Sequence, residues 1–111
     1  MILTNKAKED FIDYLWESKF KKEGYKEYED YIENQKESHT YADIIEWFDS
    51  SGIYIDAEFF RKNIKDEPQF VSSTTDEWNG LQPLGVQYNS RQEATKQAII
   101  KANILYNDKK R

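Results

Sequence analysis

The spacing of apolar residues changes at Gly52, and this change restricts the chain to a fold that mixes helices with strands. Before Gly52, apolar residues recur every three or four positions, as they do on one face of a helix. Gly52 itself favours the left-handed conformation that ends many helices. After it the spacing becomes two, which is typical of a half-buried strand. The two faces of that strand are Ile53, Ile55, Ala57 and Phe59, and Tyr54, Asp56, Glu58 and Phe60.

Three helices are predicted before this first strand. The first begins near Thr4 or Asn5, and either residue can cap it. The second covers residues 25–37, where tyrosines recur at helical spacing. The third begins at a capping box formed by Thr40 and Asp43.

Two more strands are predicted after the first. Residues 70–75 are rich in Val, Ser and Thr, which favours a second strand. The Asn-Gly pair at 79–80 is a hairpin-turn signal, and a third strand is predicted to follow it, with Leu84, Val86 and Tyr88 on one face. Pro83 has no backbone N–H to donate, so we expect this third strand either to lie at an edge of the sheet or to bend at Pro83.

The last helix is predicted to begin at a capping box formed by Ser90 and Glu93. We expect residues 107–111 to form a polar tail beyond it. Small side chains recur along this helix and permit a close approach to a sheet: Ala94, Ala98 and Ala102.

These elements predict an α+β fold with the order α-α-α-β-β-β-α. Sequential strands with short connections favour a three-stranded antiparallel meander, and we expect the C-terminal helix to cover it. At 111 residues the chain is predicted to be a single domain, residues 1–111. Residues 1–52 would form its acidic helical part, and residues 53–106 its sheet and closing helix.

Charge is divided unevenly along the chain. Residues 1–60 carry seven Lys/Arg and fifteen Asp/Glu, a net charge of −8, whereas residues 61–111 carry nine and six, a net of +3. A surface as acidic as the first part repels nucleic acids and membranes and attracts basic protein surfaces. The 15% of aromatic residues argues against disorder, so this charge is expected on a folded surface.

Few residue types that perform catalysis are present. Cysteine is absent, His39 is the single histidine, and the four glycines are isolated, which excludes a thiolate site and a phosphate-binding loop. Asp56 and Glu58 share a strand face and could hold a divalent metal, but their acidic surroundings would repel a phosphate-bearing substrate. We therefore expect no catalytic residue, no cofactor, no metal and no enzymatic activity.

The acidic residues between 23 and 49 have two interpretations. They are a solvated helix face, or they are a surface that binds a basic partner. Like charges four residues apart oppose helix formation by roughly a few tenths of a kcal/mol each, which a binding role would explain. Trp78, in the predicted hairpin turn, is a candidate anchor. The candidate partner-binding residues are Glu27, Asp30, Glu33, Glu37, Asp43, Glu46, Asp49 and Trp78.

Two stretches, residues 41–55 (YADIIEWFDSSGIYI) and residues 88–107 (beginning YNSRQEAT), resemble small uncharacterised proteins carried by phages and prophages of Bacteroidota-type bacteria. The resemblance covers the C-terminal two thirds of the chain. It implies an origin in a mobile element but assigns no functional residue. Small acidic phage proteins often act on host defence, and anti-CRISPR proteins are one such class, so this step is an analogy.

Three functions remain open from the sequence. The first is an inhibitor that imitates nucleic acid and occupies a basic groove of a host protein, such as a CRISPR effector. The second is a phage structural or regulatory protein that self-associates, and the third is a metal-dependent enzyme built on Asp56 and Glu58. No apolar segment follows Met1, and no apolar run approaches the roughly 20 residues that cross a bilayer. We expect a protein of the host cytoplasm that contacts neither membrane nor nucleic acid directly.

Overall fold

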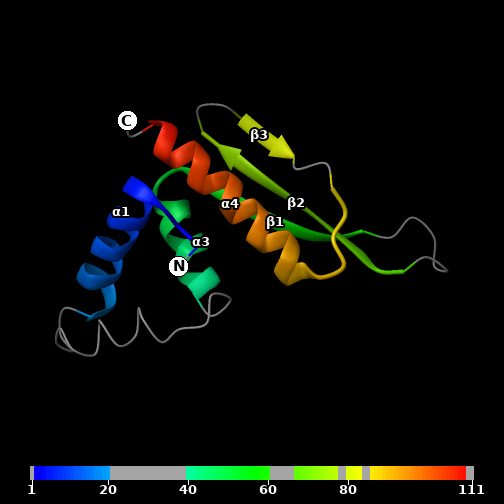
Figure 1. The fold of residues 1–111 in the computed structure, drawn as a ribbon, viewed down its shortest axis with the longest axis horizontal. Helices are drawn as coiled ribbons and strands as arrows, with labels where there is room; N and C mark the ends of the chain where they lie inside the picture. Colours follow the sequence, from blue (N-terminus) through cyan, green and yellow to red (C-terminus); the bar gives the residue numbers. More distant parts are fainter. Residues whose placement is uncertain (1, 21–39, 61–66, 78–79, 84–85, 110–111) are drawn as a thin grey trace.

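The computed structural model describes residues 2–20, 40–60, 67–77, 80–83 and 86–109. Helix α1 spans Asn5–Leu15 and continues as a π-helix, η1, over Trp16–Phe20. Helix α3 spans Tyr41–Ser50, and strands β1 and β2 span Ile53–Phe60 and Gln69–Asp76. Strand β3 spans Gly80–Pro83, and helix α4 spans Arg91–Lys109 (Figure 1).

The body of the sheet is a hairpin of two eight-residue strands. Strands β1 and β2 are antiparallel, and their register runs from Ile53 opposite Asp76 to Phe60 opposite Gln69. The four-residue β3 pairs with only the second half of β2. The spatial order is β1-β2-β3, so β1 forms one edge of the sheet.

The predicted order α-α-α-β-β-β-α and the predicted meander are corrected, although the α+β class is right: the sheet has two eight-residue strands, β1 and β2, and its third strand is the four-residue β3. The helix predicted over residues 25–37 lies outside the described residues. The third strand was expected to carry Leu84, Val86 and Tyr88, whereas β3 begins at Gly80 and ends at Pro83. In the described part of 84–88, only Tyr88 pairs, through a single bridge to Phe70. A proline cannot donate to the ladder, and Pro83 is the last residue of β3.

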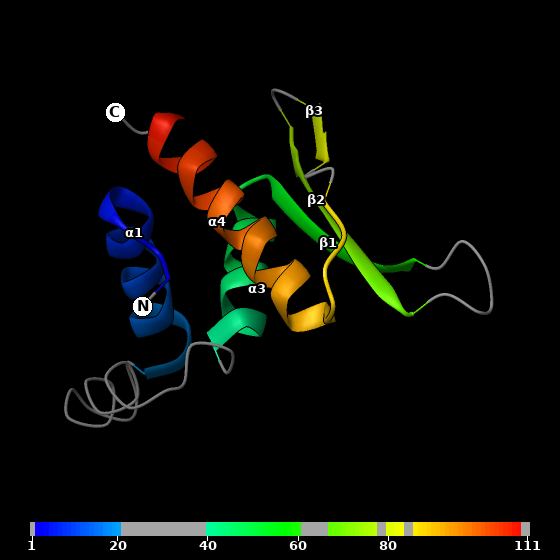
Figure 2. The same ribbon diagram turned by 45° about the vertical axis from the view of Figure 1, so that its right-hand side comes forward.

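Helix α4 lies across one face of β1 and β2 (Figures 1 and 2). Its three alanines, Ala94, Ala98 and Ala102, are fully buried, and their small side chains allow the helix to approach the strands closely. The Thr74 hydroxyl in β2 donates a hydrogen bond to the carbonyl of Ala98 at 2.9 Å. At its start, the Ser90 hydroxyl accepts a hydrogen bond from the N–H of Glu93 at 3.0 Å, so the predicted cap is formed.

The end of α4 differs from the prediction. The helix continues to Lys109, whereas residues 107–111 were expected to form a tail. The reason is a specific partner, because the Lys109 ammonium pairs with the fully buried carboxylate of Asp76. A buried carboxylate without such a partner would be strongly destabilising.

The hydrophobic core lies where α1, α3 and α4 meet. Its centre is the indole ring of Trp47, whose centroid lies 5.7 Å from the ring of Phe11 and 4.8 Å from that of Tyr106. The centroid of the Phe48 ring lies 4.7 Å from that of the same indole. Aromatic rings from all three helices therefore pack as one cluster, at distances that favour edge and tilted arrangements.

The start of α1 is capped by α4. The Thr4 side chain makes no capping bond. Instead the side-chain carbonyl of Asn107 accepts a hydrogen bond from the N–H of Ala7 at 2.8 Å, and that of Asn103 accepts one from the N–H of Thr4 at 3.0 Å. The predicted caps of α1 by Thr4 or Asn5 are therefore wrong, and Thr40 likewise makes no side-chain cap bond to α3.

Candidate functional site

Five of the predicted partner-binding residues lie outside the described residues: Glu27, Asp30, Glu33, Glu37 and Trp78. The other three are on α3, where they follow one another at intervals of three residues. Such a row turns by roughly 60° per step around a helix, because three residues fall short of a full turn of 3.6. Asp43, Glu46 and Asp49 therefore do not form one flat surface.

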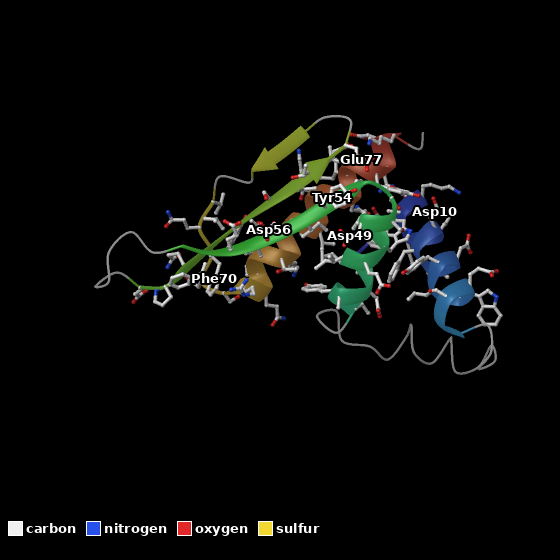
Figure 3. The ribbon with its side chains drawn as sticks, turned by 180° about the vertical axis from the view of Figure 1, so that it is seen from behind. Asp10, Asp49, Tyr54, Asp56, Phe70 and Glu77 are labelled. Carbon is white, nitrogen blue, oxygen red and sulfur yellow. The ribbon has the colours of Figure 1, made fainter. Side chains whose placement is uncertain are left out.

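The structure separates these three acids by what they contact. Asp43 is half-buried, whereas Glu46 and Asp49 are exposed. Glu46 accepts a hydrogen bond from the Tyr14 hydroxyl at 3.1 Å, which directs it toward α1. Asp49 is four residues before the first residue of β1, and its carboxylate is exposed. Of the three, Asp49 is therefore the acid nearest to the start of β1 along the chain, and Figure 3 shows it in the same view as Tyr54 and Asp56.

Alternation along β1 places a second set of acids on the face that α4 does not cover. Tyr54, Asp56 and Glu58 are all exposed there. The Tyr54 hydroxyl donates a hydrogen bond to Glu77, just beyond the end of β2, at 3.0 Å (Figure 3). That bond, and then the charge of Glu77, raises the pKa of Tyr54 above its ordinary value. The tyrosine therefore links β1 to the end of β2 at one end of this face.

Asp56 and Glu58 form a close pair of carboxyl groups farther along the strand. A side-chain hydrogen bond with Asp56, and then the repulsion of its charge, raise the pKa of Glu58 above its ordinary value. Repulsion between two neighbouring carboxylates makes it unfavourable for both to be ionised. A cation placed against them would relieve that repulsion.

We define the acidic face as Asp49, Asp56, Glu58 and Glu77. In the described part of the chain, no lysine or arginine forms an ion pair with any of these four carboxylates. By contrast, Lys6 pairs with Asp10 at 3.1 Å within α1, and Lys109 pairs with Asp76. The negative charge of the acidic face is thus directed to solvent.

The acidic residues also bear on metal binding. Among the described residues, no group of three His, Cys, Asp or Glu side chains could hold a metal ion. Asp56 and Glu58 share a face, as their spacing predicted, and His39 lies outside the described ranges. Among the described residues, Asp56 and Glu58 can therefore attract a positive charge.

Sequence reasoning missed Tyr54 and Glu77 as members of the surface. Their contact depends on strand register, because Tyr54 is opposite Thr75, two residues before Glu77. Antiparallel pairing of the strands predicted at 53–60 and 70–75 would have placed Glu77 near the start of β1. The alternating pattern of 53–60 and the Val, Ser and Thr residues of 70–75 were the available signal.

Comparison of the chain with protein-family models, with curated proteins and with solved structures finds no match. Within the described ranges, none of the helices combines the length and the apolar character needed to traverse a bilayer. The fold and the acidic face therefore define the chain as an α+β protein with an exposed anionic sheet surface.

Proposed function

We propose that the chain is a non-enzymatic accessory protein of a mobile element, and that its acidic face binds a basic surface of a host protein. The observation that carries this proposal is the acidic face itself, four carboxylates that no described lysine or arginine neutralises. Asp56 and Glu58 lie so close that the pKa of Glu58 is raised. A basic partner would relieve this repulsion when it binds. Before binding, the negative charge of the acidic face would attract the partner and raise the rate of association.

An inhibitor of a host defence nuclease fits this chemistry. A nuclease holds its nucleic acid in a basic groove, and a row of protein carboxylates competes for the same cations. The resemblance to phage and prophage proteins supports this role, because such proteins benefit from blocking host nucleases. The net charge of −5 disfavours direct binding of the chain to nucleic acid.

The test begins with affinity capture from the native host, followed by identification of the captured protein by mass spectrometry. Binding of that protein is then measured for the wild type and for a double variant, Asp56→Asn with Glu58→Gln. We expect weaker binding by the variant and a smaller dependence of affinity on salt, because two charge contacts are lost.

The matched control changes the same charge elsewhere. Glu9 and Asp13 are exposed on α1, away from the outer face of the sheet, so Glu9→Gln with Asp13→Asn alters the net charge equally. Equal weakening by both double variants would contradict a role for the acidic face. A chain that captures no host protein and sediments as a dimer would instead support a self-associating component.

A further inference from the structure

The open edge of β1 offers backbone groups that no strand of the sheet uses. In an antiparallel pair, successive residues direct their N–H and C=O groups alternately toward the partner strand and away from it. The carbonyl of Gly52 accepts a hydrogen bond from the N–H of Glu77 at 3.1 Å, so even-numbered positions face β2. Ile55 and Ala57 therefore direct their backbone groups away from β2, toward the edge.

The side chain of Arg91 shows that a hydrogen-bond donor can reach the backbone at this edge. The Arg91 guanidinium, at the start of α4, donates a hydrogen bond to the carbonyl of Ala57 at 2.8 Å. Its central carbon lies 5.3 Å from the centroid of the Phe70 ring. Among the residues that the structure describes, no other group bonds to the outward backbone of Ile55 or Ala57. Arg91 is exposed, so the site that it occupies is open to solvent.

The side chains beside this edge select the charge of an added strand. A strand paired with β1 would place its side chains directly opposite Asp56 and Glu58 on the outer face. Lysine or arginine at those positions would be attracted to the carboxylates. A second copy of the chain would be repelled, because symmetric antiparallel pairing centred on Ala57 places Asp56 of each copy opposite Glu58 of the other.

We propose that the edge of β1 binds an extended segment of a partner protein as an added strand, with Lys or Arg at alternate positions facing Asp56 and Glu58. This inference rests on the proposed function of the acidic face and names how the partner is recognised. Main-chain hydrogen bonds to Ile55 and Ala57 hold the segment, and the two carboxylates choose a basic one.

The test uses a synthetic peptide in which lysine alternates with threonine, long enough to span β1, and two N-methylated forms of it. When the lysines face Asp56 and Glu58, the threonine N–H groups point toward β1 and the lysine N–H groups point away. Methylation of the threonine nitrogens should weaken binding by at least about tenfold, because each lost hydrogen bond contributes to affinity. Methylation of the backbone nitrogens of the lysines is the control. It leaves the charge of the peptide unchanged and should preserve binding.

Amide hydrogen exchange gives a second measurement. On binding, the N–H groups of Ile55 and Ala57 should become protected, whereas those of Tyr54 and Asp56 are protected beforehand by β2. If all three peptides bind equally and Ala57 gains no protection, strand addition is overturned while charge-based binding by the acidic face stands. Binding by none of the peptides also overturns strand addition, and capture of a host protein then decides the proposed function separately.

Discussion

At the scale of single residues, two backbone positions decide how α3 is connected to β1 and β2 to β3. Gly52 has a φ of +82° and Gly80 a φ of +76°, both in the left-handed region. A Cβ on Gly52 would lie 2.7 Å from Oε2 of Glu77, whereas one on Gly80 would have no neighbour within 4 Å among the described residues. A side chain at Gly80 would therefore add only conformational strain, whereas one at Gly52 would add both strain and a steric clash with Glu77.

Gly52→Ala should lower the free energy of unfolding by about 1–2 kcal/mol, because a side chain disfavours the left-handed conformation. Gly80→Ala carries the same conformational cost without the contact to Glu77. Denaturant titration of both variants measures the difference, which is the cost of displacing Glu77. A Gly52 variant as stable as the wild type would show that the helix end does not depend on this conformation.

A second residue-scale prediction concerns the cap that α4 supplies to α1. Asn107→Ala should destabilise the protein by about 0.5–2 kcal/mol, the usual effect of a lost helix cap. Asn89→Ala is the control, because Asn89 is exposed and its one side-chain contact, to Gln69, is at 3.4 Å. The denaturation midpoints of the two variants check this, and equal midpoints would contradict the capping role.

At the scale of elements, α4 depends on its alanines. Ala98→Leu should cost roughly 1–3 kcal/mol, because Ala98 is fully buried against the sheet and its carbonyl accepts the Thr74 hydroxyl. Ser90→Ala should cost about 0.5–2 kcal/mol by removing the cap on Glu93. Ile104→Leu, at a position 48% exposed, is the control on the same helix. A midpoint unchanged by Ala98→Leu would mean that α4 does not press on the sheet.

Local patterns predicted the elements whose cause is local. The change of spacing at Gly52 located β1, and the Ser90 cap located the start of α4, because neighbouring residues determine both. The third strand was predicted wrongly because the residues before Pro83, rather than after it, continue the hairpin turn. The caps of α1 come from residues about 100 positions away, which no local pattern reports.

The candidate site divides in the same way. The shared face of Asp56 and Glu58 followed from strand alternation, but no sequence pattern indicated that Asp49, rather than Glu46, lies nearer to them. That assignment depends on how α3 packs against β1, and the link through Tyr54 depends on the register of β2.

At the scale of the whole molecule, the acidic face should make stability depend on pH. The pKa of Glu58 is raised in the folded state, so the folded chain holds its proton more strongly than the unfolded chain does. Stability contributed at this site is therefore present at low pH and is lost as pH rises through the raised pKa. Glu58→Gln should remove that loss and be more stable than the wild type near neutral pH.

Thermal unfolding between about pH 4 and pH 7 measures this effect. Asp56→Asn should act in the same direction, because it removes the other member of the pair. Glu9→Gln, on α1, is the control and should not reproduce the gain. A Glu58 variant that follows the wild-type pH profile would show that the two carboxyl groups do not interact.

The bonds from Asn103 and Asn107 to the start of α1 also have a consequence for synthesis on the ribosome. The first turn of α1 acquires its hydrogen-bond partners only after residue 107 has left the exit tunnel. The ring contact between Trp47 and Tyr106 likewise forms only after Tyr106 has emerged. Contacts so distant in sequence close the largest loops and form late. The nascent helical part therefore remains without its native core during translation, and the emergence of α4 completes it.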